Sequence, residues 1–271
     1  MKREKIFKGV KRAVVKIGTQ VLTSPNNRLD VSVIEHLVQQ VCRLKKERNT
    51  EVILVTSGAI AAGMHVLGWE KRPGEIDKLQ AAASIGQSRL MRVYERLFKE
   101  EGINVGQILL TRDVFTVPAR KKNAGETIKT LLKFKVIPVI NENDSVAVDE
   151  IKLGDNDTLA ALVAELVSAD MLVIVTDVDG LSVCDPKKTG RCEVIGFVDD
   201  FSAVKGIAES GVPSKQGVGG IKSKIAAARY VTERGASCVI LNGKKTWSIT
   251  GAFEGKDVGT VFVPRGKKGR G

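Results

Sequence analysis

The chain has 271 residues, of which 43% are hydrophobic and 27% charged, and its formal net charge is +12. This length can bury a substantial core. Because the sequence has no apolar run of 18 residues and no signal-peptide pattern, we expect neither a membrane span nor a secretory leader. Residues 1–12 carry +5 and residues 264–271 carry +4, so the body between them carries only +3, which is too little for a dedicated nucleic-acid binder. We therefore expect a cytoplasmic protein with no membrane partner and no specific nucleic-acid partner. Its four cysteines show no metal-ligand spacing and are expected to be free thiols.

Short β-branched runs alternate with helical patterns along the whole chain. This alternation predicts an α/β fold, in which helices cover both faces of a parallel sheet. The expected strands are Ala13–Ile17, Glu51–Val55, Asn104–Leu110, Val136–Ile140, Met171–Thr176 and Ser237–Leu241. In such sheets ligands bind outside the carboxyl ends of the strands, so the loops that follow these runs hold the candidate site. A division into two lobes near Asp170 is expected.

The first two strands each end in residues suited to an anion. Lys16 ends the first apolar run and is followed by Gly18, which lets a ligand approach the backbone. The second run ends in Thr-Ser-Gly, so that Ser57 and Gly58 point a hydroxyl and backbone N–H groups at one spot. The alternatives are a lysine whose stem merely covers apolar surface, and an ordinary helix N-cap.

Two polar clusters flank a loop between residues 135 and 167. The run Val136–Ile140 breaks into Asn-Glu-Asn-Asp ending at Asp144, and Gly-Asp-Asn-Asp, which includes Asn156 and Asp157, leads into a helix expected near Thr158. Carboxylates at a helix start favour the helix dipole, so each acid alone is explained as a cap. Together the clusters indicate binding of an amino-acid ammonium or carboxylate, orientation of lysines, or Mg²⁺ binding.

Two later loops are suited to a nucleotide. Thr176 and Asp177 end an apolar strand, although the following Asp-Gly is also typical of a turn. Glycines of the segment GVGGIKSK then precede a helix expected at Ile225–Arg234, which predicts a phosphate cradle to which Lys224 adds charge; a flexible basic loop is the alternative. The spacing matches neither the P-loop pattern GxxxxGK[ST] nor the dinucleotide-binding pattern GxGxxG, so neither of these two kinds of site is predicted.

These loops resemble the amino acid kinase family, and within it the enzymes that phosphorylate L-glutamate. The matching segments span about residues 12–263: VVKIGT, LVTSGAIAAG, AAASIGQ, PVINENDSV, LGDNDTLAALVA, TDVDGL and GVGGIKSK. The resemblance implies a three-layer αβα sandwich around a mostly parallel eight-stranded sheet. It also implies transfer of phosphate from ATP, with Mg²⁺, to the side-chain carboxylate of L-glutamate, the first step of proline synthesis. The chain would be one domain, with an acceptor lobe (12–170), a nucleotide lobe (171–263) and a basic tail (264–271).

The resemblance also assigns roles to residues. Lys16, Asp157 and Lys224 would be catalytic. L-Glutamate would be held by Ser57, Gly58, Asp144 and Asn156. ATP would be held by Lys16, Thr176, Asp177, Val218, Gly219, Gly220, Ile221, Lys222, Ser223 and Lys224. A homo-oligomer, dimeric or tetrameric, and feedback inhibition by proline are further expectations, and no protein metal ligands are predicted.

The chain departs from the family pattern in three places. Val218, Ile221 and Ser223 replace Thr, Met and Thr of the usual GTGGMxTK segment, and Glu126 replaces the second asparagine of an RxxNxxN pattern. Many relatives carry a C-terminal PUA domain, and a short form without it is expected here. Two alternatives to a kinase for L-glutamate stay open. One is a kinase of the same fold for acetylglutamate, aspartate or a phosphate monoester, and the other is a non-catalytic anion- or nucleic-acid-binding protein.

Overall fold

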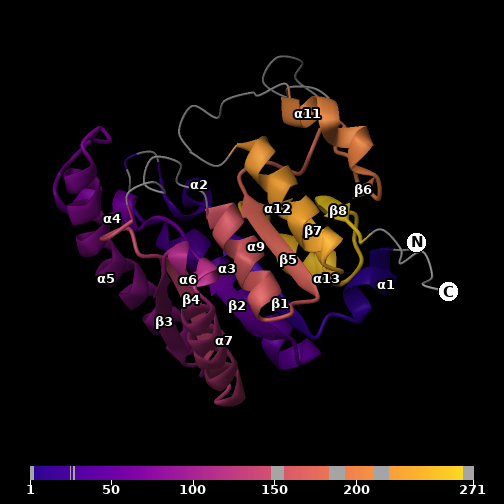
Figure 1. The fold of residues 1–271 in the computed structure, drawn as a ribbon, viewed down its shortest axis with the longest axis horizontal. Helices are drawn as coiled ribbons and strands as arrows, with labels where there is room; N and C mark the ends of the chain where they lie inside the picture. Colours follow the sequence, from indigo (N-terminus) through magenta and orange to yellow (C-terminus); the bar gives the residue numbers. More distant parts are fainter. Residues whose placement is uncertain are drawn as a thin grey trace.

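The fold is built around one continuous sheet of eight strands (Figure 1). A computed structural model describes residues 3–24, 26, 28–147, 156–182, 193–209 and 220–264. The strands are β1 (Arg12–Ile17), β2 (Glu51–Val55), β3 (Val105–Leu110), β4 (Ile137–Glu142), β5 (Met171–Thr176), β6 (Phe197–Val198), β7 (Ser237–Asn242) and β8 (Thr260–Phe262). Their order is β3-β4-β2-β1-β5-β7-β8-β6. Among the pairings between these described strands, only that of β7 with β8 is antiparallel, so β8 and β6 run against the other strands, and the mostly parallel sheet is confirmed.

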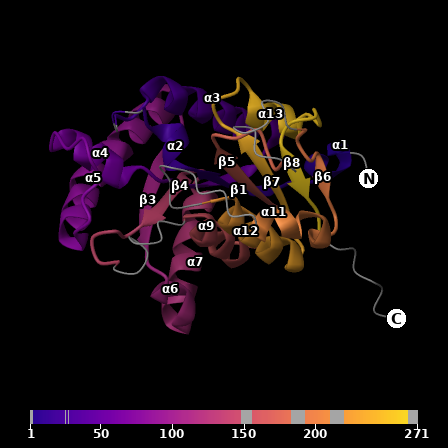
Figure 2. The ribbon, with the colours of Figure 1, turned by 90° about the horizontal axis from the view of Figure 1, so that it is seen from above.

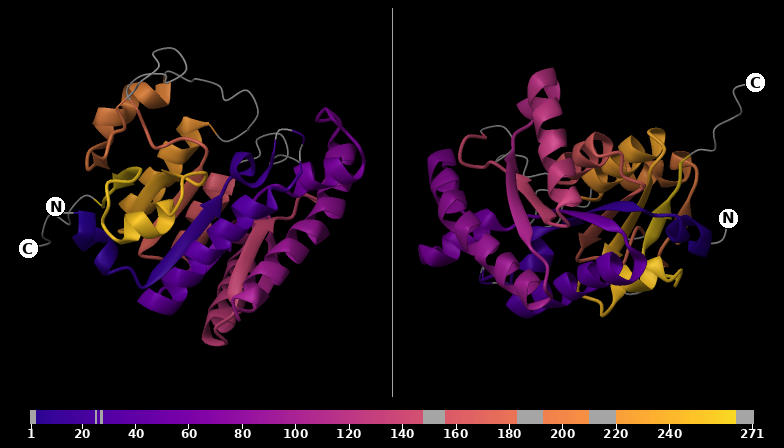
Figure 3. Two further views of the ribbon diagram at one scale, coloured as in Figure 1. Left: turned by 180° about the vertical axis from the view of Figure 1, so that it is seen from behind. Right: turned by 90° about the horizontal axis from the view of Figure 1, so that it is seen from below.

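Helices cover both faces of this sheet, which gives the expected three layers (Figure 2). One face packs against α1 (Arg3–Lys8), α2 (Thr19–Leu22), α3 (Val31–Arg48), α5 (Ile76–Glu100) and α13 (Ser248–Phe253). The other packs against α7 (Pro118–Lys133), α9 (Asn156–Leu166), the 3₁₀ turn η1 (Phe201–Val204) and α12 (Ile221–Glu233). Three short helices, α4 (Ala59–Val66), α6 (Asp113–Thr116) and α11 (Lys205–Glu209), complete the described elements. Figure 3 shows the indigo α1 beside the yellow C-terminal part of the chain, where the rings of Phe7 and Phe253 lie 5.3 Å apart.

The alternation of side chains along β1 decides which layer each residue faces. Val15 and Ile17 belong to the core beneath α3 and α5, whereas Val14 belongs to the core beneath α9 and α12. Successive strand residues point to opposite faces. Lys16 therefore shares the face of Val14 and points toward α9 and α12.

Several element boundaries differ from the sequence-based expectation. β4 continues through Asn141 and Glu142, which pair in register with the last two residues of β3, because strand pairing holds polar residues that the apolar run alone does not include. α9 begins at Asn156 rather than near Thr158, and α12 begins at Ile221 rather than Ile225. β6 and β8 were not predicted, since two and three residues are too few to show a periodic pattern.

Two further expectations are partly covered by the described residues. No helix in the described ranges is long and apolar enough to cross a membrane. Cys42 and Cys238 are buried free thiols, while Cys184 and Cys192 lie outside the described residues.

Candidate active site

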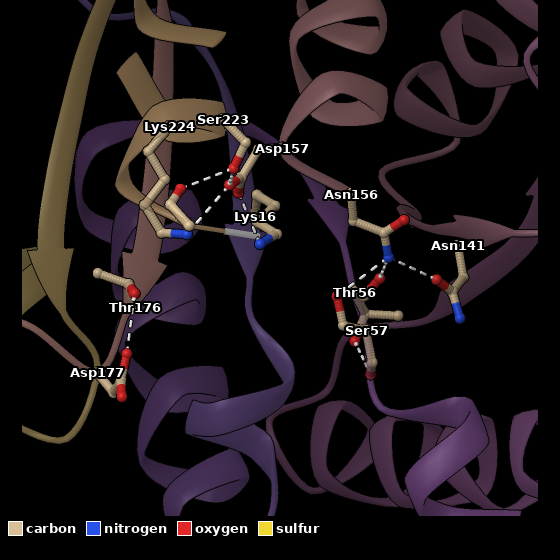
Figure 4. Close-up of polar contacts among 11 residues, drawn as sticks. Lys16, Thr56, Ser57, Asn141, Asn156, Asp157, Thr176, Asp177, Ser223 and Lys224 are labelled. Atoms are coloured by element: carbon tan, nitrogen blue, oxygen red, sulfur yellow. Dashed lines mark hydrogen bonds and ion pairs between the residues drawn. The ribbon is translucent and has the colours of Figure 1, made fainter. Parts of the chain in front are cut away.

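Two lysines and one aspartate from three elements meet at the carboxyl end of the central strands (Figure 4). Lys16, on β1, places Nζ 2.7 Å from Oδ1 of Asp157, in the first turn of α9. Lys224, in the first turn of α12, places Nζ 3.1 Å from Oδ2 of the same carboxylate. Ser223 Oγ donates a hydrogen bond to Oδ2 at 2.8 Å. Asp157 is 0% exposed and the lysines are 5% and 6% exposed, so this charge cluster is buried.

The carboxylate in this cluster is held in its ionised form. Burial by itself raises the pKa of Asp157, but the charges of Lys16 and Lys224, with hydrogen bonds from Lys16 and Ser223, lower it to about 2. The α9 dipole acts in the same direction. Asp157 in turn explains why a cation is tolerated in the first turn of α12, where the dipole disfavours it. With two cations to one anion, the cluster retains an excess positive charge, and it can therefore stabilise a phosphate-like anion.

A second cluster consists of amide and hydroxyl groups beside the first. Asn156 Nδ2 lies 2.5 Å from the Thr56 carbonyl oxygen, 3.0 Å from Ser57 Oγ and 2.9 Å from Asn141 Oδ1 (Figure 4). Asn141 Nδ2 donates to Gln87 Oε1 at 2.8 Å. Neighbouring helical residues point about 100° apart, so one turn of α9 supplies Asn156 to this amide network and the next residue to the charge cluster.

Close contact between α4 and α5 fixes the backbone beside the amide network. α4 follows Gly58, whose φ of +95° favours glycine. A Cβ atom on Gly63 would lie 1.8 Å from the carbonyl oxygen of Ala82, and one on Gly86 would lie 1.8 Å from that of Ala59. The glycines of SGAIAAG and AAASIGQ therefore let the two helix backbones touch, which holds the start of α4 at the sheet edge.

A third group of polar side chains follows β5 and β7, on the other side of β1. Thr176 Oγ1 donates to Asp177 Oδ1 at 3.2 Å, and Thr176 pairs in register with Asn242. Asn242 Nδ2 donates to Asp179 Oδ1 at 2.9 Å, and Lys245 Nζ lies 2.7 Å from Asp179 Oδ2. These groups form a polar shelf at the same edge as the charge cluster, in which Thr176 is buried and Asp177, Asp179 and Lys245 are exposed.

The structure brings most of the predicted residues to one edge of the sheet, but not all into contact. The charge cluster joins the three predicted catalytic residues, and the amide network joins Ser57 and Asn156. Asp144 lies in the turn after β4, with Arg72 as a charge neighbour. It belongs to neither the charge cluster nor the amide network.

The predicted nucleotide segment is covered only from Gly220 onward. Gly220 is the N-cap of α12, and the next four residues, of which Lys222 is exposed, form its first turn. Val218 and Gly219 lie outside the described residues.

Sequence reasoning missed two residues and gave a third no role. Gln87 and Asn242 were not singled out, and Asn141 was noted only as part of a polar cluster. Gln87 ends the AAASIGQ motif, Asn242 ends β7, and Asn141 follows the apolar residues of β4. A polar residue that follows an apolar strand was the available signal for the two asparagines, whereas a glutamine within a helix gave none.

Comparison with known proteins places this site in a family. The chain is 47% identical over 253 residues to a glutamate 5-kinase of Caldanaerobacter subterraneus subsp. tengcongensis, covering 93% of this chain and 68% of that relative. It is 44% identical over 260 residues to a glutamate 5-kinase of Clostridium tetani, covering 96% and 97%.

Two solved structures share the fold at low sequence identity. A carbamate kinase from Giardia lamblia bound to AMP-PNP has a TM-score of 0.65 at 15% identity, over 94% of this chain and 99% of that one. A UMP kinase from Ureaplasma parvum has a TM-score of 0.63 at 15% identity with the same coverage. A model of the amino acid kinase family matches residues 11–242. This match, and the identity of 44–47% to the two relatives above, establish that the chain belongs to the amino acid kinase family.

Proposed function

We propose that this chain is a glutamate 5-kinase, which transfers the γ-phosphoryl group of ATP to the side-chain carboxylate of L-glutamate. The products are γ-glutamyl phosphate and ADP, in the first step of proline synthesis. The similarity to glutamate 5-kinases over nearly the whole chain supports this proposal. The observation that carries it is the buried charge cluster next to the amide network, because these two clusters suit a phosphoryl group and an amino-acid acceptor respectively.

The reaction we propose needs charge and positioning rather than a base. A γ-carboxylate oxygen of glutamate attacks the γ-phosphorus, the bond from that phosphorus to the bridging oxygen breaks, and ADP leaves with the electron pair. The carboxylate is already ionised at neutral pH, so no proton has to be removed. Lys16 and Lys224 stabilise the negative oxygens of the transferring group, and Asp157 holds both ammonium groups in place.

The amide network is proposed to bind the acceptor. Ser57 Oγ accepts a hydrogen bond from Asn156, so its own proton is available for a carboxylate oxygen. Gly58 offers backbone in the same loop, and Asp144 supplies a carboxylate for the ammonium group. We therefore propose that glutamate binds in the lobe of residues 12–170.

The nucleotide is proposed to bind on the opposite side of the charge cluster, in the lobe of residues 171–263. Thr176 and Asp177 on the polar shelf contact the nucleoside, and the segment 218–224 at the start of α12 holds the phosphates. The helix N-terminus favours an anion there. The charge cluster then lies between donor and acceptor.

Magnesium is proposed to enter with the nucleotide rather than to occupy a site on the protein. Among the described residues, no three His, Cys, Asp or Glu side chains are grouped to hold a metal ion. Both oxygens of Asp157 already contact lysines. These residues therefore do not fit a resident metal, whereas Mg²⁺ commonly binds to substrate phosphates and water.

Assay of the purified protein with MgATP and a panel of acceptors tests the proposed function. L-Glutamate, acetylglutamate, L-aspartate and a phosphate monoester are compared by ADP release. Turnover with L-glutamate is expected to exceed that with every other acceptor. Activity that prefers another acceptor would refute the substrate assignment. Lys129→Ala, on the exposed side of α7, is the matched surface control and should show the same acceptor preference as the wild-type chain.

We further propose that the protein is a homo-oligomer, dimeric or tetrameric, and that proline inhibits it. Exposed apolar side chains on the edge strand β3 and at the two ends of α7 support self-association: Leu109 is 37%, Val117 40% and Phe134 73% exposed. A mass measurement in solution and a proline titration of glutamate turnover test these two statements. A monomeric mass, or turnover unchanged by proline, would contradict them separately.

A further inference from the structure

A glutamine outside the proposed chemistry ends the amide network. Gln87, on α5, accepts a hydrogen bond at Oε1 from Asn141 Nδ2 at 2.8 Å. Its own Nε2 is buried and has no hydrogen-bond partner among the described residues. An unpaired buried donor is unfavourable and calls for an explanation. Gln87 lies beside the proposed acceptor site, so we ask how its hydrogen bond affects the orientation of Asn141.

Only one orientation of each amide satisfies this network. Asn141 Oδ1 accepts from the backbone N of Glu142 at 2.9 Å and from Asn156 Nδ2 at 2.9 Å. Its Nδ2 therefore faces Gln87 and needs an acceptor there, because Asn141 is only 2% exposed to solvent. Rotation of the Gln87 amide would bring two N–H donors together. The favourable orientation is thus the one that leaves Gln87 Nε2 without a partner.

The order of donors and acceptors continues from Asn141 to the loop after β2. Asn156 Nδ2 shares its two hydrogens among three oxygens, the Thr56 carbonyl at 2.5 Å, Asn141 Oδ1 at 2.9 Å and Ser57 Oγ at 3.0 Å. Because an amide nitrogen only donates, Ser57 can only accept from it. With its oxygen acting as acceptor, the Ser57 hydroxyl is left to donate its proton. An acceptor atom on Gln87 is in this way linked to a donor hydroxyl at the other end of the network.

We propose that Gln87 is a positioning residue of the acceptor site, which acts through Asn141 and Asn156 to keep the Ser57 hydroxyl turned as a donor toward a substrate carboxylate. This proposal rests on the proposed function, since it assumes that the acceptor carries a carboxylate. The role of Gln87 goes beyond the proposed function, because this residue is proposed to contact neither glutamate nor ATP. The chemical class selected is an acidic amino acid, whose carboxylate matches a donor hydroxyl.

The test compares Gln87→Met, which has similar length but no acceptor, with the wild-type chain. The KM for L-glutamate is expected to rise about 10-fold, equivalent to about 1.4 kcal/mol. The KM for ATP and kcat at saturating glutamate are expected to stay within about 3-fold, because the charge cluster is untouched. An unchanged KM for glutamate, or equal changes in both KM values, would overturn the proposal.

A matched control and a double variant separate positioning from loss of stability. Gln40 is buried and its Oε1 accepts hydrogen bonds from Ile249 N at 2.8 Å and Thr250 N at 3.3 Å, away from the site. Gln40→Met is expected to lower Tm without raising the KM for glutamate. If Gln87 acts through Asn141, the double variant Gln87→Met/Asn141→Ala raises this KM no further than Asn141→Ala alone; additive increases would overturn the proposal.

Two further comparisons cover a variant that does not fold and an acceptor other than glutamate. If Gln87→Met does not fold, Gln87→Glu keeps an oxygen at the same position. Its KM for glutamate is then expected to stay within about 3-fold of wild type, and an increase equal to that of Asn141→Ala would overturn the proposal. If the acceptor panel selects another substrate, the same comparison is made with that acceptor, so that failure of the glutamate assignment and failure of the Gln87 role are distinguished.

Discussion

Replacing Asp157 by asparagine tests the charge cluster most directly. The change keeps the shape of the side chain and removes the one negative charge between Lys16 and Lys224. At 2.7 and 3.1 Å, each ion pair is worth roughly 5–6 kcal/mol of attraction at an effective dielectric constant of about 20. Burying three charges offsets most of this attraction. We therefore expect Asp157→Asn to lower the free energy of unfolding by about 3–5 kcal/mol, the usual cost of leaving buried charges unpaired.

The same variant is expected to lose turnover. Two ammonium groups without their common partner no longer hold the geometry that the transferring phosphoryl group needs, so kcat should fall about 10²–10³-fold. ATP binding should persist, because the phosphates supply the missing negative charge. Urea denaturation and steady-state kinetics at saturating substrates measure the two effects. A folded variant with kcat within about 3-fold of wild type would refute the proposed role of the cluster.

Acid titration gives an independent check on Asp157. Its pKa of about 2 in the folded protein lies below the value of about 3.9 in an unfolded chain. The stabilisation is therefore complete above the unfolded pKa and is lost as pH falls toward 2. The difference in unfolding free energy between wild type and Asp157→Asn should narrow from pH 5 to pH 2. Asp257→Asn, which alters an ion pair whose carboxylate is 89% exposed, should change stability by less than about 1 kcal/mol. A gap that stays constant over this pH range would show that the carboxylate is not the source.

Three further predictions concern other parts of the site. Lys224→Ala should lower kcat at least about 10²-fold, as expected for loss of one preorganised charge, and near-normal turnover would contradict it. Asn156→Ala should chiefly raise the KM for glutamate, about 10-fold, because a ground-state contact is lost; a kcat defect at unchanged KM would mean that its role is different. Gly86→Ala should destabilise the protein by several kcal/mol, because its Cβ would lie 1.8 Å from a backbone oxygen, and a Tm equal to that of wild type would exclude the close helix contact.

Much of this architecture follows from patterns along the chain. Six of the strands are visible as β-branched runs, because strands buried on both faces are almost continuously apolar. The polar residues that follow those runs are the candidate site, since parallel strands bring their carboxyl ends to one edge. β6 and β8 could not be predicted in this way, because their pairing with neighbours, and not their own composition, makes them strands.

The partners of each side chain were decided by the tertiary structure. The sequence marks Lys16, Lys224 and Asp157 as charged residues at element ends, but each alone is also explained as a cap or a solvated side chain. Sheet parity turns Lys16 toward α9, and packing of α9 against α12 brings Lys224 to the same carboxylate. Burial then makes the three charges depend on one another, which no local pattern can specify.

The neighbouring residues Asn156 and Asp157 show the same division most clearly. The sequence by itself placed both at the start of a helix and indicated a polar site. Only the fold could separate their roles, because the rotation of about 100° per helical residue turns Asp157 to the lysines and Asn156 to Ser57 and Asn141. The strand order, with β1 between β2 and β5, then sets the proposed acceptor and donor on opposite sides of that helix turn.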